Sequence, residues 1–199
     1  MKTYEAKTLE EVIQLACQDL GVTPDQLTYQ VIEEKKGLFS KKAVIECYTM
    51  AMVQEYLENF VRKTITNMGF EVETVSYIQD GRIYCNVNAD NNSILIGKGG
   101  VILRALNLIA RTAVQTQFKE RINVSIDING YKENRYKKVA SMAKRIGKQV
   151  QRSKIAAKLD PIPADERKVV HQVISEMEHL KTESQGEGKE RFITISYVD

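Results

Sequence analysis

The spacing of apolar residues along the chain changes between two, as in strands, and three to four, as in amphipathic helices. Residues 2–8 alternate and predict a strand, and residues 9–20 place their apolar side chains on one face of a helix. Two alternating runs within 27–49 predict two strands joined by a basic turn at Gly37. Residues 1–50 therefore predict a βαββ unit, with a core so small that it would lean on a partner or on the rest of the chain.

A second group of elements occupies residues 51–130. Helical spacing covers residues 50–70, and two alternating runs then flank Asp80 and Gly81, a dipeptide typical of a tight hairpin turn. A short helical turn, a glycine-rich loop, a long helix with one apolar face and a last alternating strand follow. The predicted order is αββααβ.

The third group covers residues 131–199. Its pattern predicts a long basic helix, a short strand before a proline-punctuated turn, a helix over 164–180, a turn over 181–191 and a final strand. The three groups together predict an α+β fold class, with three small domains at residues 1–50, 51–130 and 131–199.

Charge changes the picture of the third domain. The formal net charge of +3 conceals an uneven distribution, because residues 131–158 hold ten basic side chains and one acidic side chain, a net +9. A helix with this much positive charge favours binding to a polyanion, either nucleic acid or an anionic membrane surface. The candidate contact residues of this basic helix lie apart from its apolar stripe and are Lys137, Lys144, Lys148 and Arg152.

Composition bears on compartment and chemistry. No stretch approaches the roughly 18 consecutive apolar residues of a membrane span, and the N-terminus lacks the apolar core of a signal peptide, so we expect a cytoplasmic protein. The three cysteines form no C-x-x-C pair and favour buried free thiols. With two histidines and no evident cluster of carboxylates, the sequence predicts no metal, no cofactor and no catalytic residue, which also disfavours a two-metal nuclease.

The stretch from Ser93 to Leu103, SILIGKGGVIL, carries three glycines and a lysine where a helix should begin. A G-x-x-x-x-G-K-[ST] nucleotide loop would need glycine at Asn92 and a hydroxyl after Lys98, and the sequence has neither. A dinucleotide fingerprint would need G-x-G-x-x-G after a strand. The spacing that holds is I-G-x-x-G, where bare backbone lets a sugar-phosphate chain approach and a helix N-terminus binds phosphate. The candidate residues are Ile96, Gly97, Lys98, Gly99 and Gly100.

This segment resembles the KH domain, whose GxxG loop clamps about four nucleotides. The resemblance covers residues 51–130, and the αββααβ order is that of the type II arrangement. The alternative is a glycine-rich corner between two helices that binds nothing. The sequence leaves open whether Ile94, Leu95 and Ile96 belong to the core or to the wall of a binding groove.

Arg167 and His171 are four residues apart and so project from one helix face, where a guanidinium and an imidazole can together bind a phosphate. Alone, such a pair is common on protein surfaces. In its context, however, the whole of residues 131–199 resembles the R-three-H domain, a single-stranded nucleic-acid-binding module named for this Arg and His. Lys168 stands where many members carry a second arginine, and the glycine-rich turn before the last strand also matches. The resemblance implies contacts from Arg167, Lys168, His171, Lys189 and Arg191.

The domain order resembles that of the bacterial Jag family, also called KhpB, in which a small N-terminal unit precedes a KH domain and an R-three-H domain. Residues 33–46 resemble the basic turn of the Jag N-terminal domain, with Ser40 in place of the usual last glycine. The resemblance implies a cytoplasmic RNA-binding protein that pairs with a small single-KH-domain partner. It also implies work beside the membrane insertase and in cell-envelope growth, with membrane association through those partners.

We therefore predict a non-enzymatic protein that binds single-stranded RNA through its KH loop and its R-three-H face and acts as a post-transcriptional regulator. The sequence leaves open whether single-stranded DNA competes. The alternative is a protein–protein adaptor at the membrane insertase or cell-division machinery, which docks through residues 1–50 and uses its KH fold as a homodimer surface. An aromatic content of 7% without tryptophan argues against extensive base stacking.

Overall fold

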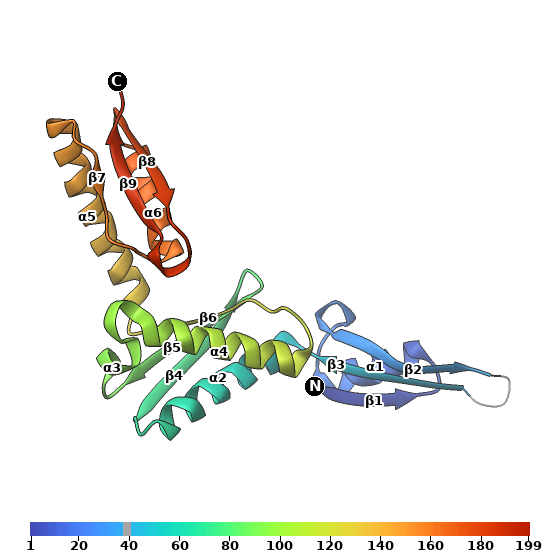
Figure 1. The fold of residues 1–199 in the computed structure, drawn as a ribbon. Helices are drawn as coiled ribbons and strands as arrows, with labels where there is room; N and C mark the ends of the chain where they lie inside the picture. The colour runs from blue at the N-terminus through green and yellow to red at the C-terminus, as the bar shows by residue number, and fades with distance from the viewer. Residues whose placement is uncertain (38–40) are drawn as a thin grey trace. The chain divides into compact units, whose positions relative to one another are not determined.

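The computed structural model describes residues 1–37 and 41–199 (Figure 1). Within these residues the strands form three sheets of three strands each, interspersed with helices, which confirms the α+β class. The chain forms two compact units, Met1–Asn129 and Gly130–Asp199. The division into three domains at 50 and 130 stays a prediction, and Ser40, in the basic turn, lies outside the described residues.

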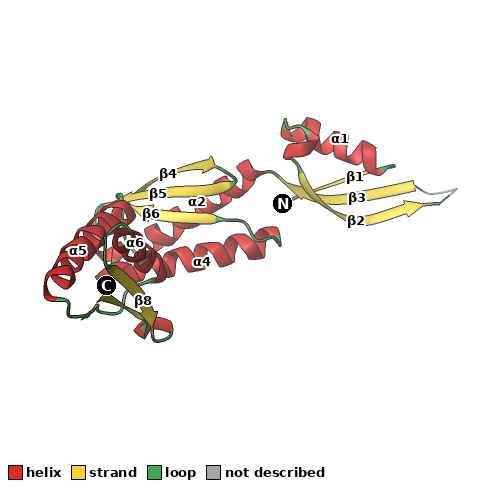
Figure 2. Ribbon diagram, turned by 90° about the horizontal axis from the view of Figure 1, so that it is seen from above, coloured by secondary structure: helices red, strands yellow, loops and turns green. Residues whose placement is uncertain are grey.

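The first part of the Met1–Asn129 unit follows the predicted βαββ order. Its elements are β1 (Lys2–Ala6), α1 (Leu9–Leu20), the short 3-10 helix η1 (Pro24–Gln26), β2 (Thr28–Lys36) and β3 (Lys41–Tyr48). The sheet is antiparallel in the order β1-β3-β2, and Figure 2 shows α1 along one side of it. The hydroxyl of Thr8 accepts a hydrogen bond from the Glu11 amide and caps α1. The buried Val12 and Ala16 of α1 share a core with Ile45.

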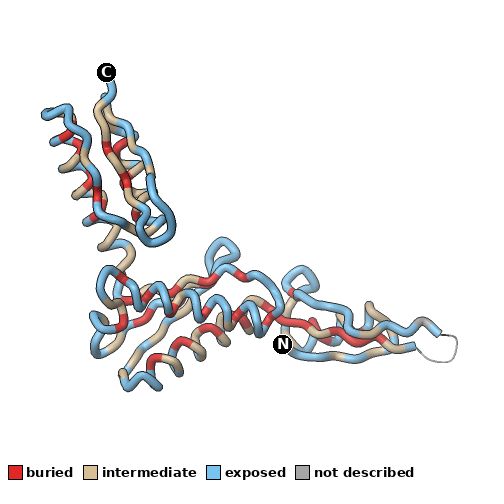
Figure 3. The backbone as a smooth tube through the Cα atoms, in the orientation of Figure 1, coloured by how far each residue is buried: buried red, intermediate tan, exposed pale blue. Residues whose placement is uncertain are grey.

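The second part of this unit has the predicted αββααβ order. Its elements are α2 (Met50–Asn67), β4 (Val72–Gln79), β5 (Arg82–Ala89), α3 (Asn92–Ile96), the short 3-10 helix η2 (Lys98–Gly100), α4 (Val101–Phe118) and β6 (Val124–Ile128). The β4–β5 pair is antiparallel and the β5–β6 pair is parallel. Buried residues alternate along the central strand β5 and the edge strand β6, among them Ile83 and Ile126, and Figure 3 shows buried positions along both strands.

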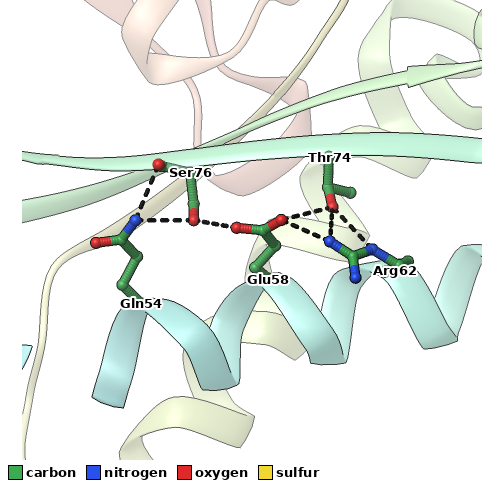
Figure 4. Close-up of polar contacts among 5 residues, drawn as sticks. All are labelled: Gln54, Glu58, Arg62, Thr74 and Ser76. Carbon is green, nitrogen blue, oxygen red and sulfur yellow. Dashed lines mark hydrogen bonds and ion pairs between the residues drawn. The ribbon is translucent and has the colours of Figure 1, made fainter. Parts of the chain in front are cut away.

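A polar cluster fixes α2 to the edge strand β4 (Figure 4). Glu58 accepts hydrogen bonds from Arg62 at 2.6 Å, from Thr74 at 3.1 Å and from the hydroxyl of Ser76, while Gln54 donates to the Ser76 carbonyl at 2.9 Å. The hydrogen bond from Ser76, followed by those from Thr74 and Arg62, holds the pKa of Glu58 below its usual range. The cluster satisfies a half-buried carboxylate and sets the position of α2 on the sheet.

The segment Asn92–Phe118 is long and apolar enough to cross a membrane by length and composition alone, with a mean hydropathy of 1.5. It is not one continuous helix, because the backbone leaves helical geometry at Gly97 before α4 begins. One face of α4, including Leu103 and Ala110, is buried in the unit, as in the core helix of a globular fold. The opposite face is exposed and includes the apolar residues Val101, Leu108 and Ile109.

The Gly130–Asp199 unit contains two helices on one antiparallel sheet of order β7-β9-β8. Its elements are α5 (Tyr131–Ser153), β7 (Ala157–Lys158), α6 (Ala164–Ser175), β8 (Leu180–Gln185), the short 3-10 helix η3 (Gly188–Glu190) and β9 (Phe192–Tyr197). The prediction of a helix to 180 and a turn over 181–191 was wrong, because α6 ends at Ser175 and residues 180–185 form a strand. The hydropathy pattern did not reveal this strand because its inward positions include the hydroxyl residues Thr182 and Ser184. These two residues pair in register with the buried Ile195 and Ile193 of β9.

Candidate nucleic-acid interface

The glycine loop adopts a backbone that other residues cannot follow. Gly97 has φ +71° and ψ 173°, a region that glycine alone enters, and a Cβ there would lie 2.7 Å from a side-chain carbon of Ile102. Gly99 has φ +59°, and a Cβ at this position would meet nothing within 4 Å. Gly97 is thus required by the fold, whereas Gly99 and the exposed Lys98 form an open tip.

A second cation stands beside this tip. The guanidinium of Arg104, from the first turn of α4, donates a hydrogen bond to the Gly99 carbonyl at 2.6 Å. The apolar residues around the loop differ in exposure. Leu95 is buried, whereas Ile94 and Val101 are more than half exposed. The loop therefore combines two cations with exposed aliphatic surface. Sequence reasoning missed Arg104, although its position one helical turn after the glycines was a usable signal.

The structure brings Arg167 and His171 to the same side of α6, but it gives both side chains partners within the fold. The two ring nitrogens of His171 lie 2.6 Å from the hydroxyl of Thr182 and 2.8 Å from that of Ser184. Arg167 donates to the Ile162 carbonyl at 2.9 Å. Because each hydroxyl can donate or accept, these two contacts hold α6 to β8 in either tautomer of the imidazole.

Positive charge surrounds this histidine. Burial, and then the nearby Arg167 and Arg191, lower the pKa of His171 below its ordinary 6.5. Arg191 follows η3 and is exposed, as are the other two predicted contact residues, Lys168 and Lys189. The predicted set is therefore a cationic surface arranged around a histidine that serves the fold.

The lowered pKa of His171 makes the stability of this unit depend on pH. The unfolded chain binds a proton at the ordinary pKa, so protonation below about 6.5 favours unfolding until the folded pKa is reached. We expect the urea midpoint of the Gly130–Asp199 unit to fall between about pH 7.5 and about pH 5.5. His171→Gln should remove part of this fall. A pH dependence in His171→Gln equal to that of the native chain would contradict the assignment.

Only two of the four predicted basic residues of α5 border a common hollow. Lys148 and Arg152 line a shallow hollow of about 470 Å³ together with Arg145. Lys137 and Lys144 do not line it, and the ammonium group of Lys137 lies 2.5 Å from the Glu133 carboxylate. Sequence reasoning missed Arg145, because helical periodicity separated the basic residues from the apolar stripe but did not show which of them border a hollow.

Among the residues that the structure describes, no cluster of His, Cys, Asp and Glu could hold a metal ion. The three cysteines are free and buried, as predicted. Burial raises the pKa of the Cys85 thiol to about 12, so the reactive thiolate is suppressed.

Comparison with known proteins covers both ends of the chain. The family model of the R-three-H domain matches residues 137–197, and that of the Jag N-terminus matches residues 4–49. The chain is 30% identical over 202 residues to the RNA-binding protein KhpB of Clostridium symbiosum, covering 98% of the chain and 91% of that relative. It is 28% identical over 210 residues to the protein of the same name in Bacillus subtilis, covering 98% of the chain and 97% of the relative. A KhpB of Streptococcus pneumoniae is 25% identical over 177 residues, 89% of the chain and 52% of the relative.

Proposed function

Because the chain belongs to the Jag family, also called KhpB, we propose that it is a non-enzymatic RNA-binding protein that binds single-stranded RNA at two sites in series. RNA binding is supported by the names of its relatives and by the matching R-three-H domain. The family resemblance extends the proposal to a cytoplasmic post-transcriptional regulator connected with cell-envelope growth.

The first site is the glycine loop, and residues 51–130 would be a type II KH domain. The observation that carries this proposal is the glycine-only backbone of Gly97, which holds Lys98 and Gly99 in an open tip beside Arg104. A phosphate can approach this tip without meeting a Cβ, and two cations can neutralise it. The exposed aliphatic surface of Ile94 would contact the bases, as in a KH groove.

The second site lies on the R-three-H domain. The exposed cations Lys168, Lys189 and Arg191 would bind phosphates, while Arg167 and His171 would position the surface that carries them. Two weak sites on one chain raise the apparent affinity for a long strand by about 10² to 10⁴ when the strand reaches both.

Titrating labelled single-stranded RNA and duplex RNA of equal length by fluorescence anisotropy, at two salt concentrations, tests this function. We expect tighter binding of the single strand and an affinity that falls with salt, since each neutralised phosphate contributes about −0.7 to the logarithmic slope. Equal affinity for the duplex would contradict the proposed mode, and no binding to either would leave the protein–protein adaptor as the better account.

The exposed face of α4 favours a protein partner. Val101, Leu108 and Ile109 are each more than half exposed and form an apolar stripe with Ala105. We propose that this stripe binds a second KH-type domain, supplied by a small single-KH protein or by another copy of the chain.

Sedimentation velocity of the purified chain tests the stripe. In the absence of another partner we expect concentration-dependent dimers, and Leu108→Lys/Ile109→Lys should abolish them because two charges would be buried at the contact. Val75→Lys/Ile78→Lys, at two exposed apolar positions on β4, adds the same charge as a matched control and should still dimerise. A monomeric native chain would point to the separate single-KH protein, and an unaffected double variant would exclude the stripe.

A further inference from the structure

A groove runs between α5 and the segment after β7. It encloses about 580 Å³ and lies entirely within the Gly130–Asp199 unit. Met142, Ile146 and Ile162 contribute apolar lining. The charged lining consists of the cations Arg135, Lys138, Arg145 and Lys158 and one carboxylate, Asp160. We call this groove the α5 groove. It is separate from the predicted contact residues around His171, none of which line it.

The cations of the α5 groove are not equivalent. Arg135 donates two hydrogen bonds of 2.9 Å to the buried Glu166, so its charge is neutralised within the fold. Lys138 and Arg145 are exposed, and within the part of the chain that the structure describes neither takes part in an ion pair. These two cations are therefore available to a ligand.

The available cations form a row. Lys138, Arg145 and Arg152 are spaced by seven residues, which places them on nearly the same helix face at intervals of about 10.5 Å. Arg145 lines both the α5 groove and the neighbouring hollow that contains Arg152. An extended anion can thus follow the helix along a continuous line of positive charge.

From the proposed RNA-binding function, and from this combination of a cation row with an apolar floor, we propose that the α5 groove binds a segment of single-stranded nucleic acid. Phosphates lie along Lys138 and Arg145, and an unstacked base packs against Met142 and Ile146. A duplex keeps its bases stacked and paired, so it cannot place an unstacked base on the apolar floor. The acidic side chains of a protein segment would pair with the cations. They would bring no apolar group to cover Met142 and Ile146.

The chain offers a matched control for this groove. Lys154 and Lys181 belong to the same unit, are also exposed, and line neither the α5 groove nor the neighbouring hollow. Lys138→Gln/Arg145→Gln and Lys154→Gln/Lys181→Gln therefore change the net charge by the same amount. A general attraction to the positive charge of this unit would respond equally to both pairs.

The experiment uses the full chain carrying Lys98→Asp/Gly99→Asp, which removes the loop site, and a labelled polyuridine strand of about 20 nucleotides, longer than the roughly four held by a KH loop. We expect the groove pair to lower the affinity about tenfold and to reduce the logarithmic salt slope by about 1.4, the value for two phosphate contacts. The control pair should change affinity less than about twofold. Met142→Gln should weaken binding of the polyuridine strand but not of an abasic strand.

Equal losses from the two pairs, or no loss from either, would overturn the groove while leaving RNA binding by the native chain intact. An unchanged affinity in Met142→Gln would overturn the base contact. A polyglutamate peptide bound through Lys138 and Arg145, with RNA binding unaffected by the groove pair, would assign the groove to an acidic protein segment instead. If the native chain bound no RNA, the proposed function would fail together with the groove.

Discussion

Lys98→Asp/Gly99→Asp is expected to lower the affinity for a short single-stranded RNA by about 30-fold, or ~2 kcal/mol. The change reverses one charge and adds a second negative charge at the tip that we propose approaches phosphate. The fold should survive, since a side chain at Gly99 meets nothing within 4 Å and Asp tolerates the left-handed backbone better than most residues. Anisotropy at low salt measures the loss, and circular dichroism checks the fold.

The hairpin turn at the other end of β5 supplies a matched control. Gly81 has φ +68° and, like Gly99, open space around its Cβ position, and it precedes the exposed Arg82. Gly81→Asp/Arg82→Asp therefore makes the same change of charge, again at a glycine with positive φ. We expect it to retain most of the affinity. If the two variants bind alike, the loop is a structural corner and the R-three-H domain binds the RNA.

The sequence was sufficient where local chemistry and periodicity agree. The order of helices and strands around the glycine loop followed from alternating runs, the Asp80–Gly81 turn and the apolar face of α4. The unusual backbone of Gly97 was likewise signalled by its residue type. These features depend on neighbours within a few residues, so one sequence contains them.

Tertiary contacts account for what the sequence did not reveal. The strand β8 has a polar face because Thr182 and Ser184 meet His171, so its inward positions do not look apolar. The α5 groove depends on residues far apart in sequence, Arg145 and Ile162, which periodicity cannot bring together. A tertiary contact also distinguishes two arginines of α5. Glu166 of α6 neutralises Arg135, whereas Arg145 is available.

Glu166 is a buried charged residue whose loss should strongly destabilise the Gly130–Asp199 unit. Its side chain is 4% exposed and accepts both hydrogen bonds from Arg135, which is 34% exposed. Glu166→Ala would leave a half-buried guanidinium without its partner. The penalty for breaking a fully buried pair is about 3–5 kcal/mol, and the partial exposure of Arg135 reduces the expected loss to about 2–3 kcal/mol of unfolding free energy.

Urea denaturation of the full chain, followed for this unit, measures the effect of Glu166→Ala. Glu133→Ala removes the exposed partner of Lys137 on the same helix and should leave the midpoint unchanged. Arg135→Met/Glu166→Leu should recover much of the lost stability, because an apolar pair of similar volume needs no charge compensation. Recovery would show that the pair matters because a buried charge must be matched. A double variant as unstable as Glu166→Ala would contradict this and assign the loss to the two hydrogen bonds, whose geometry would then be what holds α5 against α6.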